Sequence, residues 1–361
     1  MDKILNKYLV FGFLKIILNV FLIFICLGII MNLFEEIEFF KNLDTGIGLP
    51  FVLTVMFIPN LIIKLLPFII FIAAMWFVIS IKSNTDFVAL KIFGYSNLKI
   101  IFTLSITAFM FGVIVLIAVN PVTSAMVKYY ENTKAQYSKD IDHLVSINKN
   151  GVWIKETIDK KFIITTAREL QGNFLYSVTI YRLNENNILI DRIDANKVDI
   201  STNEWFIDKS SVYSALEDTL IKNQMNLVIK SNYNIAKLNT LYKNLDTISF
   251  FALLTEYKSL NKRGYSKTIL NEKLNSFISL PIFLFLMVTL ACIFAVGNVK
   301  KTQNFYYIFI SIATCVLVYY FKDLSIALGL TNKISLTLSV WMPIIAIFLF
   351  CSIGLIQVNE K

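Results

Sequence analysis

The segment SNTDFVALKIFGYS, residues 83–96, carries the most specific side-chain pattern in the chain. Ser83 is followed three residues later by Asp86. This is the spacing of a capping box, in which a hydroxyl and a carboxylate bind the exposed amides of a helix's first turn. The pattern therefore predicts a helix start within a polar connection.

The same segment has one apolar helix face and a stop signal. Phe87 and Leu90 lie three residues apart with Ala89 between them, and Gly94 is a natural helix terminator. A short amphipathic helix of this kind is suited to a groove on a partner protein. The alternative is an interfacial loop helix that rests on the membrane.

Charged residues near apolar stretches are the other candidates, because charge is costly beside hydrocarbon. Lys64 lies between Pro59 and Pro67, where it either snorkels to lipid headgroups or contacts an anionic lipid. Lys41 is the second candidate for a lipid contact. It follows the acidic run of Glu35, Glu36 and Glu38, which we interpret as a solvated helix end, with a cation or subunit contact as the alternative.

Signatures of catalysis are missing from the sequence. It has no G-x-x-x-x-G-K-[ST] phosphate loop and no G-x-S-x-G nucleophile elbow. The single histidine, His143, has no second histidine or cysteine nearby to complete a metal site, so it is interpreted as a surface residue. We therefore predict a non-catalytic chain without catalytic residues, metal or bound cofactor.

Six stretches are apolar enough to cross a hydrocarbon core of ~30 Å. They cover approximately residues 9–31, 62–81, 100–119, 277–297, 305–321 and 336–356. The run from Leu49 to Lys82 is too long for one perpendicular span, so its first half is expected outside the core or strongly tilted. With mean hydropathy +0.65 and 56% hydrophobic residues, a soluble protein is excluded. The four cysteines lie in these spans and form no disulfide framework.

Lysines in the short loops set the orientation. The N-terminal segment and the connections after spans two and four have an excess of basic residues, whereas the connections after spans one and five do not. The lysines concerned are Lys3, Lys7, Lys15, Lys82, Lys91, Lys99, Lys300 and Lys301. This predicts cytoplasmic termini and an insert on the far side of the membrane. The net charge of +9 follows partly from that bias and needs no nucleic acid partner.

Short alternating runs separated by turn-formers indicate an all-β insert over 122–247, which is an antiparallel sandwich, an open barrel or a jellyroll-like domain. The runs are Val152–Lys155, Phe162–Thr166, Tyr176–Tyr181, Ile188–Ile190, Val198–Ile200, Trp205–Ile207 and Met225–Ile229. Residues 248–276 change to helical spacing, with Gly264 as a helix stop, and are predicted to form an amphipathic connector. The fold class is a polytopic α-helical membrane protein: spans one to three lie in 1–121 and spans four to six in 277–361.

The chain resembles the LptF/LptG permease family of the lipopolysaccharide exporter over essentially its whole length. The family's cytoplasmic loop has the form S-E-L-V-A-x-x-x-x-G-x-S, which is matched here at Val88, Ala89, Gly94 and Ser96, with Asp86 in place of glutamate. Further matching segments are PNLIIKLLP (59–67), NPVTSAM after span three, GVWIK (151–155) and KDLSIALGLTNKISLTLSVWMP (322–343). The last is more similar to LptG than to LptF.

The resemblance implies a permease subunit that pairs with an LptF-like permease in a heterodimer. An LptB-like ATPase dimer would bind ATP and magnesium and dock on the loop, through Ser83, Asp86, Phe87, Ala89, Leu90 and Gly94. An LptC-like gate protein and an LptA-like periplasmic bridge complete the inner-membrane system, which extracts lipopolysaccharide from the outer leaflet. Family members often carry phosphate-binding lysines at the outer end of span one, where this chain has three glutamates and Lys41.

Two other classes share some of these features. An ATPase-coupled mechanotransmitting membrane protein would need the cytoplasmic helix but no wide lipid cavity. A membrane-embedded enzyme acting on lipid-linked sugars would need paired carboxylates, for which only the glutamate cluster could serve. Copurification with an ATPase separates the first two from the enzyme, and bound glycolipid separates the exporter from the mechanotransmitter.

Overall fold

The computed structural model has two compact units, one helical and one β. It describes residues 2–41, 46–83, 86–137, 144–148, 151–158, 161–171, 173–184, 188–214, 220–235, 245–262, 267–297, 304–331 and 333–359. The helical unit comprises residues 1–133, 246–251 and 271–361, and the β unit comprises 134–245 and 252–270. His143, Gly264, Lys300 and Lys301 lie outside the described residues.

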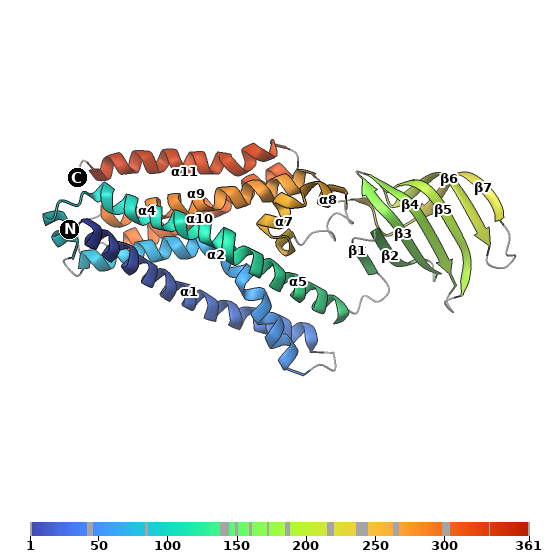
Figure 1. The fold of residues 1–361 in the computed structure, drawn as a ribbon, viewed down its shortest axis with the longest axis horizontal. Coiled ribbons are helices and arrows are strands. Elements are labelled where there is room, and N and C mark those ends of the chain that lie inside the picture. Colours follow the sequence, from blue (N-terminus) through green and yellow to red (C-terminus); the bar gives the residue numbers. More distant parts are fainter. Residues whose placement is uncertain are drawn as a thin grey trace. The chain divides into compact units, whose positions relative to one another are not determined.

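Six helices of the described chain are long and apolar enough to cross a membrane, which confirms the six predicted spans. They are α1 (Asp2–Phe40), α2 (Gly48–Ser83), α4 (Asn97–Ile114) with its continuation, α9 (Lys267–Gly297), α10 (Asn304–Leu330) and α11 (Leu336–Asn359). Both chain ends lie at the same end of the helical unit (Figure 1). Cytoplasmic termini on one membrane face require this arrangement.

All six helices extend beyond the predicted limits of their spans. α2 is unbroken from Gly48 through Pro59 and Pro67. At ~1.5 Å per residue it exceeds the hydrocarbon thickness, as its length in the sequence predicts. The third helix continues through a π segment, Val115–Val119, into α5 (Asn120–Tyr137), so residues 122–137 are helical rather than β. α9 begins at Lys267, ahead of the predicted start at Phe277.

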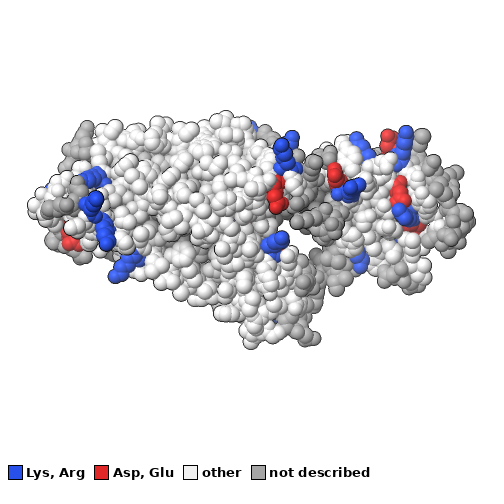
Figure 2. All heavy atoms as spheres, viewed as in Figure 1, with Lys and Arg blue, Asp and Glu red and all other residues white. Residues whose placement is uncertain are grey.

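The buried apolar core of the helical unit is built mainly from α2 and α9, and α1, α4 and α11 each add a few residues. α1 and α10 leave most of their apolar surface exposed in the chain alone. On the face shown in Figure 2, a long stretch of helical surface shows no Lys, Arg, Asp or Glu. Such a surface is suited to acyl chains or to another apolar helix.

The β unit is one antiparallel sheet of seven strands in the order β1-β2-β3-β4-β5-β6-β7, which confirms an inserted all-β domain. The strands are β1 (Leu144–Asn148), β2 (Gly151–Ile158), β3 (Lys161–Gln171), β4 (Phe174–Leu183), β5 (Leu189–Asp199), β6 (Glu204–Ser214) and β7 (Leu220–Lys230). The sheet curls, as Figure 1 shows, around a core that includes Trp205, Ile180 and Ile193. Two predicted runs, 188–190 and 198–200, lie at the two ends of one strand, β5. Residue 188 precedes this strand, and residue 200 follows it.

The alternation of buried and exposed residues changes phase along one line across the sheet. Two consecutive residues turn away from the core on each of the middle strands: Arg168 and Glu169, Tyr176 and Ser177, Asn196 and Lys197, and Asp208 and Lys209. Strand register is unchanged across this line. Ser177 (φ 51°) and Asn226 (φ 60°) adopt left-handed backbone there. These conformations bend the sheet without inserting residues.

The predicted connector is two short helices, α7 (Phe250–Thr255) and α8 (Tyr257–Lys262), after a turn at Leu245–Thr247. Helical spacing is therefore confirmed, but its last predicted part belongs to α9. The sequence shows no sharp boundary there because the first turns of α9 are polar and its core residues come later.

Candidate functional site

The predicted cytoplasmic helix exists as α3, Asp86–Ile92. Leu90 is only 2% exposed and packs into the core of the helical unit. Phe87 is half-buried against the same core. In the chain alone, Leu90 therefore anchors α3 to the membrane helices instead of facing outward.

The end of α3 has the expected glycine stop. Gly94 has φ +80°. Its N–H donates to the carbonyl of Lys91 (2.9 Å), and the N–H of Tyr95 donates to the carbonyl of Leu90 (2.9 Å). These are the two bonds of a Schellman motif. Ser96 then caps α4, because its side chain accepts a hydrogen bond from the N–H of Lys99 (3.2 Å).

Two hydrogen bonds join this segment to α1. Tyr8 donates from its hydroxyl to Asp86 (2.8 Å), and Tyr95 donates from its hydroxyl to Asn6 (3.0 Å). Both α1 residues come from the first turns of the chain. A displacement of α3 would therefore act directly on α1.

Lys82, at the end of α2, connects α3 to α9. Its ammonium group donates to the carbonyls of Ala295 (2.6 Å) and Val296 (2.9 Å), at the C-terminal end of α9. It also lies 5.7 Å from the centre of the Phe87 ring. A cation at this position satisfies terminal carbonyls and opposes the negative end of the helix dipole.

Apart from Lys91, the outward surface of α3 is apolar. Val88, Ile92 and Phe93 are 57%, 78% and 50% exposed, and Ala89 and Gly94 are exposed beside them. Ser83 ends α2 and donates to the carbonyl of Ser80 (2.9 Å). Residues 84 and 85 lie outside the described part of the chain, so the capping box between Ser83 and Asp86 stays a prediction.

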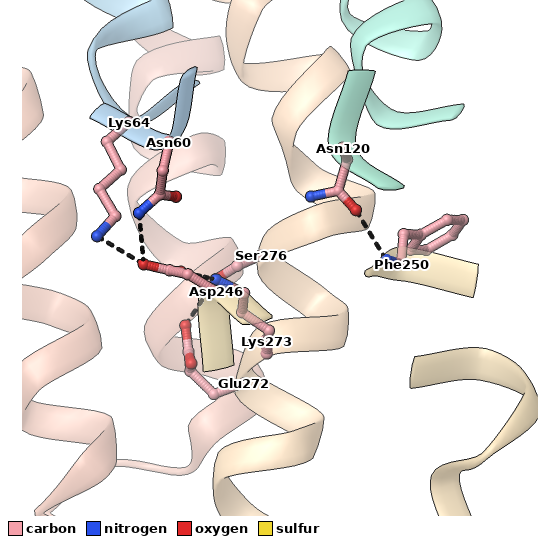
Figure 3. A network of polar contacts seen from close by, with 8 residues as sticks. All are labelled: Asn60, Lys64, Asn120, Asp246, Phe250, Glu272, Lys273 and Ser276. Carbon is pink, nitrogen blue, oxygen red and sulfur yellow. Dashed lines mark hydrogen bonds and ion pairs between the residues drawn. The ribbon is translucent and has the colours of Figure 1, made fainter. Parts of the chain in front are cut away.

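A second polar network lies where the chain returns from the β domain (Figure 3). The carboxylate of Asp246 is 2.7 Å from the ammonium nitrogens of both Lys64 and Lys273, and it accepts a hydrogen bond from the Asn60 amide (3.1 Å). Lys64 and Asn60 belong to α2, whereas Lys273 belongs to α9. We call this set of four residues the latch.

Asp246 is charged in this setting. Burial by itself would raise the pKa of its carboxyl, but Lys273 and Lys64 outweigh burial and hold that pKa well below its usual range. A largely shielded carboxylate that contacts two cations and an amide cross-links three segments of the chain.

The remaining predicted site residues are dispersed. Lys64 keeps 55% of its side chain exposed despite its ion pair, and Lys41 is exposed just after α1. Glu35 and Glu38 are exposed as predicted, but Glu36 is buried and accepts a hydrogen bond from the Tyr130 hydroxyl (2.7 Å) of α5. The prediction of a solvated helix end is therefore wrong for Glu36, because Tyr130 of α5 contacts that side of α1.

The β unit contains an open polar pocket of about 530 Å³ at its bend, lined in part by Arg192, Asp194 and Lys209. Arg192 is already paired with Asp194, their closest nitrogen and oxygen being 2.9 Å apart. Among the described residues, no group of three His, Cys, Asp or Glu side chains could hold a metal ion. Neither feature offers a catalytic arrangement.

Sequence reasoning missed several residues of these networks. Tyr8 and Asn6 carried no motif, and Lys82 contributed only to the charge bias of its loop. Asp246 was an ordinary turn residue in the sequence. Their partners are distant along the chain, so local spacing gave no signal for them.

A comparison with curated protein sequences finds no significant match. The family described as "Lipopolysaccharide export system permease LptF/LptG" matches residues 7–357, nearly the whole chain. The six spans and the inserted antiparallel sheet agree with that match. The chain therefore belongs to the LptF/LptG family of lipopolysaccharide export system permeases.

Proposed function

We propose that the chain is one of two permease subunits that extract lipopolysaccharide from the outer leaflet of the inner membrane. It pairs with an LptF-like subunit, and an LptC-like protein acts at its gate. The glycolipid leaves through the β domain to an LptA-like bridge. The termini and α3 are cytoplasmic, and the β domain is periplasmic. Family membership over residues 7–357 is the observation that carries this proposal.

In this proposal ATP hydrolysis belongs to an LptB-like ATPase dimer, which binds the ATP and magnesium. The outward residues Val88, Ala89, Ile92 and Phe93 insert into a groove on the ATPase. Phe87 and Leu90 hold α3 on the membrane helices. Force then passes to α1 through Asp86 and Tyr95, and to α9 through Lys82.

Lys64 is the better of the two candidates for a lipid phosphate contact. Its side chain is half-exposed, and one ion pair with Asp246 leaves ammonium protons available for a phosphate. Lys41 remains a weaker candidate, since exposure is the only structural feature that supports it.

Reconstitution tests this function. The chain is coexpressed with its neighbouring permease and ATPase, purified and placed in proteoliposomes containing lipopolysaccharide. We expect ATP-dependent crosslinking of the glycolipid to a periplasmic acceptor, together with bound glycolipid and ATPase in native mass spectra. Copurified ATPase without glycolipid binding or transfer would favour a mechanotransmitter, and absence of both would reject the exporter.

A further inference from the structure

The return segment, residues 245–251, is fastened to the helical unit at two places (Figure 3). The first is the latch at Asp246. The second is Phe250, whose N–H donates to the side-chain oxygen of Asn120 (2.8 Å) at the start of α5. The Phe250 ring also meets Phe277 of α9 edge to face, with centres 5.8 Å apart. The segment is therefore joined to α2, α5 and α9.

These attachment points lie beside the prolines of α2 and the π segment that precedes α5. Asn60 and Lys64 lie between or next to Pro59 and Pro67 of α2. Asn120 directly follows the π segment Val115–Val119. Proline removes a backbone donor, and π segments locally change the hydrogen-bond ladder, so helices bend most easily at such points. The return segment thus contacts α2 and α5 at points where these helices bend most easily.

We propose that Asp246 is a positioning residue for lipid transfer. It keeps the return segment attached to α2 and α9 during turnover, so that these two helices move together at this end of the helical unit. The latch does not open in the cycle, because its carboxylate is shielded and held by two ammonium groups. This inference rests on the proposed export function. In that function the ATPase acts at α3, at the end of the helices opposite to the latch.

The test measures lipid transferred per ATP hydrolysed in the reconstituted complex. Asp246→Asn keeps the shape of the side chain but removes its charge. We expect this ratio to fall roughly tenfold while ATP hydrolysis and subunit assembly are unchanged, the size of effect seen for residues that couple distant sites. Asn120→Ala, which removes the second attachment, is expected to lower the same ratio.

A matched control is Asp191→Asn. Asp191 is paired with Arg182, and its side chain is 14% exposed, as is that of Asp246. Its ion pair joins two neighbouring strands of one sheet, so the variant should keep normal transfer. Asp246→Glu retains the charge and should recover most of the ratio.

Crosslinking separates a fixed latch from one that opens. Cysteines at Asn60 and Asp246 should impair transfer, and a short bifunctional thiol reagent joining them should restore it. Failure of the crosslink to restore transfer, or a normal ratio in both Asp246→Asn and Asn120→Ala, would overturn the inference. If Asp246→Asn does not assemble, Asn120→Ala decides in the same way. If the unaltered complex transfers no lipid, the proposed function itself is rejected.

Discussion

The ammonium group of Lys82 lies 2.6 Å from the carbonyl oxygen of Ala295, so the end of α2 caps the end of α9. These two helices belong to the first and second groups of membrane spans, on either side of the inserted β domain. The contact lies beside α3, at the end of the helices where the ATPase is proposed to bind. The latch joins the same two helices again at Lys64 and Lys273.

Lys82→Met should weaken this connection while keeping the apolar stem of the side chain. A hydrogen bond from a charged donor contributes about 1.5–3 kcal/mol, so we expect a measurable fall in the midpoint of thermal unfolding. ATP hydrolysis should also become less dependent on lipid. Tryptophan fluorescence of the purified complex reports the first effect, and an ATPase assay with and without lipopolysaccharide reports the second. Lys333→Met, at an exposed lysine beyond α10, is the control and should change neither.

Ile92→Asp should release the ATPase while leaving the partner permease bound. Ile92 is the most exposed large apolar residue of α3, and truncating an interface anchor commonly costs about 2 kcal/mol or more. Phe93→Asp should behave similarly. Leu90→Asp should instead lower expression of the whole chain, because it places a charge in the core. Copurification of each variant distinguishes these outcomes, and retained ATPase in both surface variants would reject docking at this face.

The sequence predicts the parts of this structure that depend on local pattern. Gly94 marks the helix end because only a glycine tolerates the required left-handed backbone at little cost. The sequence does not predict that Leu90 faces the core, because a seven-residue helix can turn either apolar side inward. It also misses the burial of Glu36 and the role of Asp246, because Tyr130, Lys64 and Lys273 meet them only through tertiary packing.

Membrane orientation is testable by thiol labelling. A cysteine at Lys91 should be shielded from an impermeant maleimide in cells with a permeabilised outer membrane, whereas one at Asn203 should react. Both positions are exposed on the chain itself, so a difference between them reports the membrane and not burial. The exposed native thiol Cys26 is first replaced by serine. The opposite labelling pattern would show that the topology is inverted and that the proposed ATPase site is not cytoplasmic.

The latch should contribute the same stability between about pH 5 and pH 8 and less in acid. The pKa of Asp246 is held below the value of about 3.9 expected in an unfolded chain, so its charge favours the folded state above that value. As the pH falls through about 4, the unfolded chain gains a proton first and this contribution declines. Melting curves of unaltered and Asp246→Asn protein should therefore differ by a constant amount at higher pH and converge in acid. A difference that grows in acid would contradict the assigned charge state.

The sheet leaves two edges, β1 and β7, on which another chain can continue the hydrogen-bond ladder. The run at Val152–Lys155 offers no edge, because it belongs to β2, which pairs with both β1 and β3. We expect β7 to receive the next β domain or the periplasmic bridge. Asn226 is a poor position for proline, since its φ of 60° is one that proline cannot adopt.

Val228→Pro is therefore the sharper test of this edge. Val228 is exposed and pairs with Phe206 of β6, so proline there removes one backbone donor from the outermost strand. We expect lower crosslinking of lipopolysaccharide to the periplasmic acceptor, with basal ATP hydrolysis and membrane assembly intact. Val228→Thr keeps the donor and the branched shape, and should transfer normally. Normal transfer in Val228→Pro would assign docking elsewhere, and an equal loss of ATP hydrolysis would indicate misfolding of the β domain.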